Sequence, residues 1–216
     1  IGQQLKNALE ELGPIFVKFG QLLSTRHDML SPEIIEELSI LQDKVKPFAF
    51  VEVKKIIESD LDESIENIFS NFKEEPVASA SVAQVHYAEL KDTRKVAVKV
   101  LRPNMKKQID LDLNLLEFFA SIAEFILKDG KRLKPREIVN EFRKHLYNEL
   151  DLTIEAANSS QIRRNFLNTD IIKIPENYWE YCSQNVLVME RLEGMSISDI
   201  ENLKNNNINL KKLAED

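Results

Sequence analysis

Apolar side chains recur at intervals of three and four residues along the first part of the chain, a spacing that predicts short helices. One helix is expected to begin at Pro14, because proline suits the first helical turn. Its apolar positions are Ile15, Phe16, Phe19, Leu22 and Leu23. A second helix is expected after Ser31, a candidate N-cap residue, and a third over residues 51–57.

The spacing changes after Pro76, where apolar and β-branched residues gather in short runs. Residues 82–90 and 96–101 form two such runs, and the polar segment 91–94 lies between them. This arrangement predicts two antiparallel strands joined by a hairpin turn.

Helical spacing returns over residues 105–127 and again over residues 135–166. Two short apolar runs, 171–174 and 186–189, then predict further strands, and Gly194 predicts a turn before a weakly helical end. Strands with inserted helices, closed by a strand and a glycine turn, follow the order of elements in a kinase amino-terminal lobe. The order of elements alone is weak support for a fold, so the assignment depends on the sequence motifs.

The chain has 29 basic and 36 acidic residues among 216, a net charge of −7. A generic nucleic-acid binder needs clustered excess base, so this balance argues against nucleic acid as a partner. The segment 91–107 is an exception, with seven basic residues and Asp92 as its only acid. It suits a phosphate-bearing ligand or an anionic lipid surface, and an ordinary solvated face is an equally open interpretation.

Three further features bear on the compartment and on the extent of the chain. Cys182 is the only cysteine, so no disulfide can form within the chain, as is usual in a reducing compartment. The most apolar segment, 111–127, is interrupted by acidic and polar residues, and no transmembrane helix is predicted. The chain begins at Ile1 without a leader, and we expect it to be a fragment of a longer protein.

A strand lysine is the first candidate for chemistry. Residues 96–99 read Val-Ala-Val-Lys, which places Lys99 near the end of a strand that should be buried. A buried ammonium is costly without an anionic partner, so Lys99 is expected to meet a phosphate or a carboxylate. In kinases a lysine at this position holds the α- and β-phosphates of the nucleotide. The alternative is a strand-end lysine that extends into water.

A run of small residues precedes this strand. A kinase phosphate loop follows the pattern G-x-G-x-x-G-x-V, and its four fixed places are taken here by Ala78, Ala80, Ala83 and Val85. Alanine permits close backbone approach but restricts φ more than glycine does, so a stiffer loop is expected.

Acidic residues that could pair with Lys99 occur in a later helical segment. Asp151 and Glu155 are four residues apart and should share a helical face, whereas Glu149 should project about 200° around from Asp151. Glu155 is the candidate partner of Lys99, and a solvated acidic face is the alternative.

A fourth group lies within the helix predicted to begin at Pro14. Gly20 costs about 1 kcal/mol in a helix relative to alanine, so close packing or a ligand should justify it. Lys18 and Gln21 lie on one side of the same helix. A surface lysine beside a packing glycine would explain the pattern equally well.

Together and in this order, the four elements resemble the UbiB family of atypical kinase-like proteins, most closely the amino-terminal portion of its bacterial members. The matching motifs are KxGQ at residues 18–21, the alanine-rich loop at 78–86, and ExD at Glu149 and Asp151. The resemblance assigns nucleotide binding to Ala78, Ser79, Ala80, Ser81, Val82, Ala83, Val85, Lys99, Glu155, Met189 and Glu190, the last two as the hinge between lobes. It assigns regulation to Lys18, Gln21, Glu149 and Asp151.

The fold implied by the resemblance is α+β, a kinase-like N-lobe with a small antiparallel sheet and the kinase helix C. Residues 1–72 would form a helical KxGQ extension and residues 73–190 the N-lobe with a helical insert. Residues 191–216 would form the hinge and the start of a truncated C-lobe.

The function implied by the resemblance is binding of ATP with magnesium in support of ubiquinone biosynthesis, through ATP hydrolysis or small-molecule phosphorylation. The KxGQ helices would cover the cleft, with Lys18 reaching Glu149. The implied partners are a quinone-precursor lipid or membrane surface and other ubiquinone-biosynthesis proteins, at the cytoplasmic face of the bacterial inner membrane.

A kinase also needs a catalytic-loop aspartate and a metal-binding Asp-Phe-Gly element. None of the three histidines begins an H-x-D pattern and no Asp-Phe-Gly occurs, so catalytic residues and magnesium ligands are expected downstream and the fragment alone should be inactive. Two other functions stay open. One is a non-catalytic pseudokinase or lipid-binding, chaperone-like scaffold, and the other is a helical interaction domain without a nucleotide site.

Overall fold

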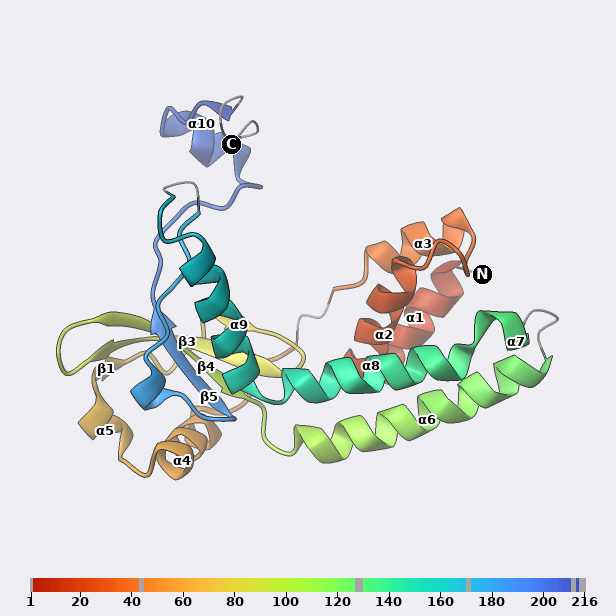
Figure 1. Ribbon diagram of the computed structural model, residues 1–216, viewed down its shortest axis with the longest axis horizontal. Helices are drawn as coiled ribbons and strands as arrows, with labels where there is room; N and C mark the ends of the chain where they lie inside the picture. Colours follow the sequence, from red (N-terminus) through yellow and green to blue (C-terminus); the bar gives the residue numbers. More distant parts are fainter. Residues whose placement is uncertain (1, 43–44, 127–129, 170–171, 211–212, 214–216) are drawn as a thin grey trace.

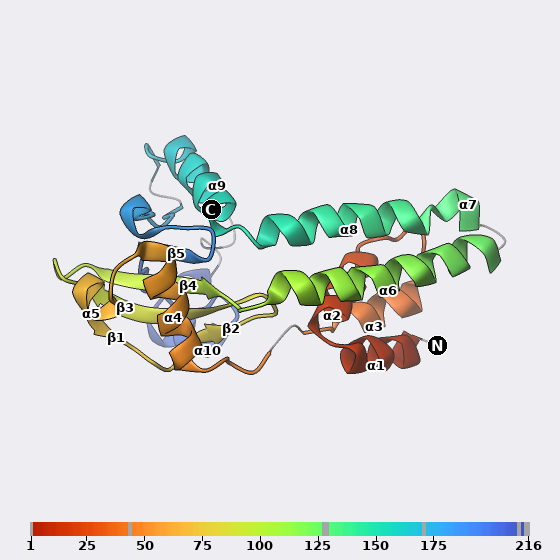
Figure 2. The same cartoon turned by 90° about the horizontal axis from the view of Figure 1, so that it is seen from below.

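The molecule is elongated, with a small sheet at one end and a helical hairpin that extends along the long axis (Figure 1). Three amino-terminal helices lie along this hairpin and not over the strands (Figures 1 and 2). This computed structural model describes residues 2–42, 45–126, 130–169, 172–210 and 213.

The sheet contains five described strands, each antiparallel to its neighbours. They are β1 (Phe69–Phe72), β2 (Ala78–Ser79), β3 (Ala83–Leu90), β4 (Lys95–Leu101) and β5 (Val186–Glu190). The order across the sheet is β1-β3-β4-β5, and β2 pairs with β3. The predicted hairpin is therefore present as β3 and β4, and its register places Val85 opposite Lys99.

The two faces of the sheet differ, because successive side chains of a strand point to opposite sides. On β4 the valines at positions 96, 98 and 100 are fully buried, whereas Ala97 and Lys99 are partly exposed. The buried face is covered by α4 (Phe50–Leu61), which the short α5 (Ile65–Ile68) connects to β1. The opposite face, which carries Lys99, stays partly open.

Two long helices form the helical hairpin, which is separate from the β-hairpin of β3 and β4. α6 (Met105–Ile126) leads away from the sheet, and α8 (Pro135–Glu149) returns to it after the short α7 (Gly130–Leu133) (Figure 1). The next helix, α9 (Leu152–Asn165), packs against β5.

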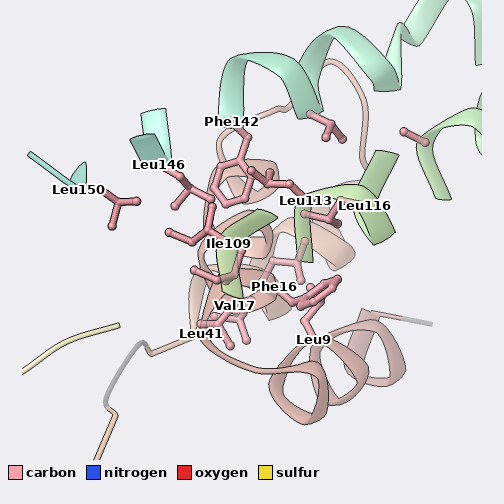
Figure 3. Packing of buried hydrophobic residues seen from close by; sticks show 14 residues of the cluster. Leu9, Phe16, Val17, Leu41, Ile109, Leu113, Leu116, Phe142, Leu146 and Leu150 are labelled. Carbon is pink, nitrogen blue, oxygen red and sulfur yellow. The ribbon is translucent and has the colours of Figure 1, made fainter. Parts of the chain in front are cut away.

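The amino-terminal helices share one hydrophobic core with the hairpin. They are α1 (Gly2–Leu12), α2 (Pro14–Ser24) and α3 (Pro32–Ser39). As predicted, Pro14 lies in the first turn of α2 and Ser31 directly precedes α3, although the Ser31 side chain makes no capping hydrogen bond. Figure 3 shows this core, whose labelled residues are Leu9, Phe16, Val17, Leu41, Ile109, Leu113, Leu116, Phe142, Leu146 and Leu150.

α6 also has an apolar face that points away from this core. Its large side chains recur at alternating spacings of four and three residues, as Leu111, Leu115, Phe118, Ile122 and Phe125. All five are exposed, and Phe125 is 91% exposed. We call them the outer stripe of α6. Among the described helices, none combines the length and the hydropathy that a membrane-spanning helix needs.

Two expectations about strands are wrong. Residues 69–72, placed among helices by their sequence, form β1 and pair with β3, because Phe69 and Phe72 pack into the sheet core. Residues 172–174 form no strand, since the edge of β5 is occupied by a bridge between Asn177 and Met189 and by the following 3₁₀ turn; position 171 lies outside the described residues. Near the end of the chain, α10 (Ile200–Asn205) is helical as expected.

Candidate functional site

Lys99 and Glu155 form an ion pair between β4 and α9. The Lys99 Nζ lies 2.8 Å from Oε1 and 2.6 Å from Oε2 of Glu155. We expected a buried pair, but the Lys99 side chain is 24% exposed and the Glu155 side chain is 47% exposed. Strand alternation explains the difference, since it places Lys99 on the open face of the sheet, where water and ligands can reach the ammonium.

The start of α9 is anchored to the sheet, and this places Glu155. Leu152 and Ala156 are buried against Leu187 of β5. The amide of Leu152 donates to the carbonyl of Gln184 at 2.9 Å. Glu155 follows Leu152 by three residues, about one helical turn, and its carboxylate therefore stands beside the strand lysine.

The alanine loop (residues 78–86) includes β2, the turn at residues 80–82 and the start of β3. The amide of Ala80 donates to the carbonyl of Ala83 at 2.9 Å and closes a tight turn. Within the described structure, the amides of Ser81 and Val82 donate to no protein acceptor, and the buried Ser81 hydroxyl has no hydrogen-bond partner. Neighbouring amides without acceptors are what an anion-binding loop offers.

A cleft of about 390 Å³ lies beside the loop on the open face of the sheet. Its lining includes Ala78 and Val85 from the loop, Ala97 from β4, and Met189 and Glu190 from the end of β5. The structure thus brings the expected hinge residues next to the expected loop residues. The small side chains of Ala78, Val85 and Ala97 leave room there for a flat ring, beside the larger Tyr87 and Arg191.

Glu190 is held by its own neighbours. The Lys173 Nζ lies 2.9 Å from its Oε1, and this hydrogen bond lowers the pKa of Glu190 below its ordinary value. The amide of Glu190 donates to the carbonyl of Glu176 at 2.7 Å. Its carboxylate and its amide are therefore both engaged within the protein.

Lys18 of α2 contacts Glu149 at the end of α8. The Lys18 Nζ lies 3.0 Å from Oε1 and 2.9 Å from Oε2 of Glu149, and the two side chains are only 18% and 23% exposed. His145 Nε2 lies 3.2 Å from the same Oε1. The expected contact between the KxGQ and ExD motifs is therefore present.

Glu149, Asp151 and Glu155 do not share one helix, which corrects the expectation of continuous helical spacing over residues 135–166. α8 ends with Glu149, and α9 begins after Asp151, whose Oδ1 accepts from the amide of Thr153 at 3.0 Å. Aspartate favours such an N-cap position because its side chain satisfies a free helix amide. The break sends Glu149 towards the amino-terminal helices and Glu155 towards the sheet.

Gly20 and Gln21 serve contacts between helices. Gln21 Nε2 donates to the carbonyl of Leu41 at 3.0 Å. A Cβ on Gly20 would lie 2.5 Å from Leu41 Cδ1 and 2.8 Å from Leu9 Cδ1. Of the two explanations left open for this glycine, close packing is the one that the structure supports.

Arg102 was not among the predicted site residues and was counted only as part of the basic segment. The Arg102 guanidinium donates to the carbonyl of Ala80 and to the hydroxyl of Ser79 in the alanine loop. Its position directly after β4, beside the start of β3, was the available signal. Two other members of the basic segment, Arg94 and Lys95, each pair with an acid of their own.

Comparisons with known proteins agree with this geometry. Residues 40–216 match the ABC1 atypical kinase-like domain. Over 214 residues the chain is 52% identical to the "Probable protein kinase UbiB" of Cellvibrio japonicus (strain Ueda107). That alignment covers 99% of this chain and 39% of the relative, so the chain spans less than half of the relative's length.

A solved structure is also similar. It is described as the complex structure of Rv3197-erythromycin from Mycobacterium tuberculosis, and it matches with a TM-score of 0.59 and 27% sequence identity. The match covers 92% of this chain and 50% of that chain. The mixed fold, with its small antiparallel sheet, is thus a kinase-like N-lobe. The chain belongs to the UbiB family of ABC1 atypical kinase-like proteins and corresponds to the family's amino-terminal portion.

Proposed function

We propose that this chain is the ATP-binding part of an atypical kinase or ATPase that serves ubiquinone biosynthesis. The observation that carries the proposal is the ion pair of Lys99 and Glu155 on the open face of the sheet, next to the alanine loop. The carboxylate holds the lysine ammonium in place, as in kinases, where such a lysine contacts the α- and β-phosphates.

Different residues around this ion pair would bind the adenine ring and the phosphates of the nucleotide. Val85 and Ala97 line the cleft that would receive the adenine ring. The amides of Ser81 and Val82, which have no acceptor in the described protein, would donate to phosphate oxygens. Lys99 would neutralise part of the phosphate charge.

Magnesium would enter with the nucleotide. Among the described residues, no group of three or more histidine, cysteine, aspartate or glutamate side chains could hold a metal ion. The proposal therefore assigns the protein ligands of magnesium, and the transfer of the phosphoryl group, to the remainder of a longer protein.

The amino-terminal helices α1–α3 lie along the helical hairpin and not over the cleft, and they are proposed to restrict which acceptors can approach from the side of the hairpin. Lys18 fastens them to Glu149, two residues before the cap of the helix that carries Glu155. A restricted cleft favours ATP hydrolysis or a small acceptor over a protein substrate. Family membership supports a full-length protein at the cytoplasmic face of the bacterial inner membrane, with a quinone-precursor lipid and other ubiquinone-biosynthesis proteins as partners.

Binding of magnesium-ATP to the full-length protein, measured by isothermal titration calorimetry, tests the proposal. Lys99→Ala is expected to weaken binding at least about tenfold, or about 1.4 kcal/mol, because the phosphate contact is lost. Lys95→Ala is the matched control, since Lys95 lies on the same strand but is 65% exposed and faces Glu193. Equal affinities of the wild type and Lys99→Ala would refute the nucleotide site.

A non-catalytic, lipid-binding scaffold is the second candidate, and the outer stripe of α6 favours it. Five exposed apolar side chains on one helix face are typical of a binding surface. The full-length protein should be assayed for magnesium-ATP hydrolysis with and without quinone-precursor lipids. Hydrolysis that depends on Lys99 supports the enzyme, whereas nucleotide binding without turnover under both conditions supports the scaffold.

A further inference from the structure

Arg102 directly follows β4 and holds the alanine loop at three points. Its Nε donates to the carbonyl of Ala80 at 3.0 Å, and its Nη2 donates to the Ser79 hydroxyl at 2.7 Å. Its backbone amide donates to the carbonyl of Val82 at 2.8 Å.

The same guanidinium contacts the linker between α3 and α4. Its Nη2 also donates to the carbonyl of Lys46 at 2.9 Å, and its central carbon lies 5.4 Å from the centroid of the Phe48 ring. Gln84 of β3 fixes the same linker, because its Oε1 accepts from the amide of Phe48 at 3.0 Å. The linker between α3 and α4 is therefore hydrogen-bonded both to β3 and to Arg102, the residue after β4.

These contacts depend on the shape of arginine. Three acceptors, on Ser79, Ala80 and Lys46, are met by N–H groups of a single planar guanidinium. The ammonium of a lysine donates from one point and does not reproduce this geometry. Burial lowers the pKa of Arg102, as expected for a group withdrawn from water.

The hydrogen bond to Ala80 also fixes an amide of the loop. The carbonyl of Ala80 and the amide of Ser81 belong to one planar trans peptide unit, so they point in opposite directions. When Arg102 holds the carbonyl, the Ser81 N–H must point away from Arg102. That N–H has no acceptor among the described residues, and Ser81 is only 2% exposed, so the conformation of the loop decides whether a phosphate can reach it.

We propose that Arg102 is a positioning residue that holds the alanine loop in the conformation that meets the phosphates of a bound nucleotide. Through Lys46 and Phe48, Arg102 also makes this conformation depend on the linker from the amino-terminal helices. The inference rests on the proposed ATP site, and it concerns the phosphates and not the adenosine part of the ligand.

The experiment compares the affinities of the full-length protein for ATP and for adenosine by calorimetry. In Arg102→Lys the preference for ATP over adenosine is expected to fall at least about fivefold, because only ATP offers phosphates to the displaced loop. Phe48→Leu, which removes the ring beneath the guanidinium, should lower the preference in the same direction by a smaller factor. If Arg102→Lys does not fold, the preference of Phe48→Leu for ATP over adenosine still tests the proposal.

Arg94→Lys is the matched control, because Arg94 lies in the turn between β3 and β4 and pairs with Asp92, far along the sheet from the loop. Its preference for ATP should stay at the wild-type value. An unchanged preference in Arg102→Lys, or an equal loss of affinity for ATP and adenosine, overturns the role of Arg102 alone. A wild type that binds no ATP overturns the proposed function as well.

Discussion

Gly20 lies where α2 approaches Leu9 and Leu41 too closely for any side chain to fit without displacing them. Gly20→Val is expected to lower the free energy of unfolding by at least about 1 kcal/mol, because added carbons overpack a filled core. Chemical denaturation measures the change. Gly194→Val is the control, since a Cβ there meets no described atom within 4 Å. A similar loss in both variants would contradict the packing role.

His86 is fully buried on the covered face of the sheet. Its Nδ1 lies 2.8 Å from the carbonyl of Lys73, which can only accept, so Nδ1 carries the proton. Its Nε2 then accepts from Gln84 Nε2 at 2.9 Å. Burial lowers the pKa of His86 below its ordinary value of 6.5, and a second proton on Nε2 would also face the Gln84 donor.

This lowered pKa predicts a loss of stability in acid. Below pH 6.5 His86 is protonated in the unfolded chain but stays neutral in the folded protein. The unfolded state therefore binds more protons, and the free energy of unfolding falls as the pH drops towards the lowered pKa of folded His86. Denaturation between about pH 7 and pH 5 should show a shallower pH dependence in His86→Gln than in the wild type. The exposed His27→Gln should keep the wild-type slope. Equal slopes in all three proteins would contradict this prediction.

At the scale of elements, one ion pair joins α2 to α8. Lys18→Ala in the full-length protein is expected to change the turnover of ATP or the selectivity among nucleotides, because it releases the amino-terminal helices from Glu149. Glu149→Ala should have the same effect, and the double variant should add little to either. Steady-state kinetics with ATP and GTP measures this.

The control for this pair is His145→Ala. The His145 side chain is 66% exposed and contacts Glu149 from α8 itself, so its loss leaves the contact between helices intact. Unchanged kinetics in Lys18→Ala, or additive effects of Lys18→Ala and Glu149→Ala, would remove the role of the amino-terminal helices in restricting acceptors.

The sequence was least informative where one element changes into another. Helical spacing continues through residues 135–166, so it could not reveal the break that makes Asp151 a cap. The four residues of β1 are too few to show a period of two. Arg102 was overlooked because its acceptors are mostly backbone carbonyls, which a side-chain pattern does not display.

At the scale of the whole molecule, much of the arrangement could be predicted. The hairpin of β3 and β4, the long helices and the meeting of Lys99 with Glu155 all follow from spacing and from the resemblance. The degree of exposure did not follow, because Lys99 lies on the face of the sheet that α9 covers only in part. The family was correctly identified from motifs that are weak singly and specific in order.

The path from α8 into α9 has a mechanical consequence. Only Leu150 and Asp151 separate the two helices, and the capping hydrogen bond of Asp151 restrains this short connection. With 22 residues, α6 makes the hairpin about 33 Å long. The helical hairpin therefore ends just before the helix that bears Glu155, and we expect a displacement of its far tip to be transmitted to the carboxylate that steadies Lys99.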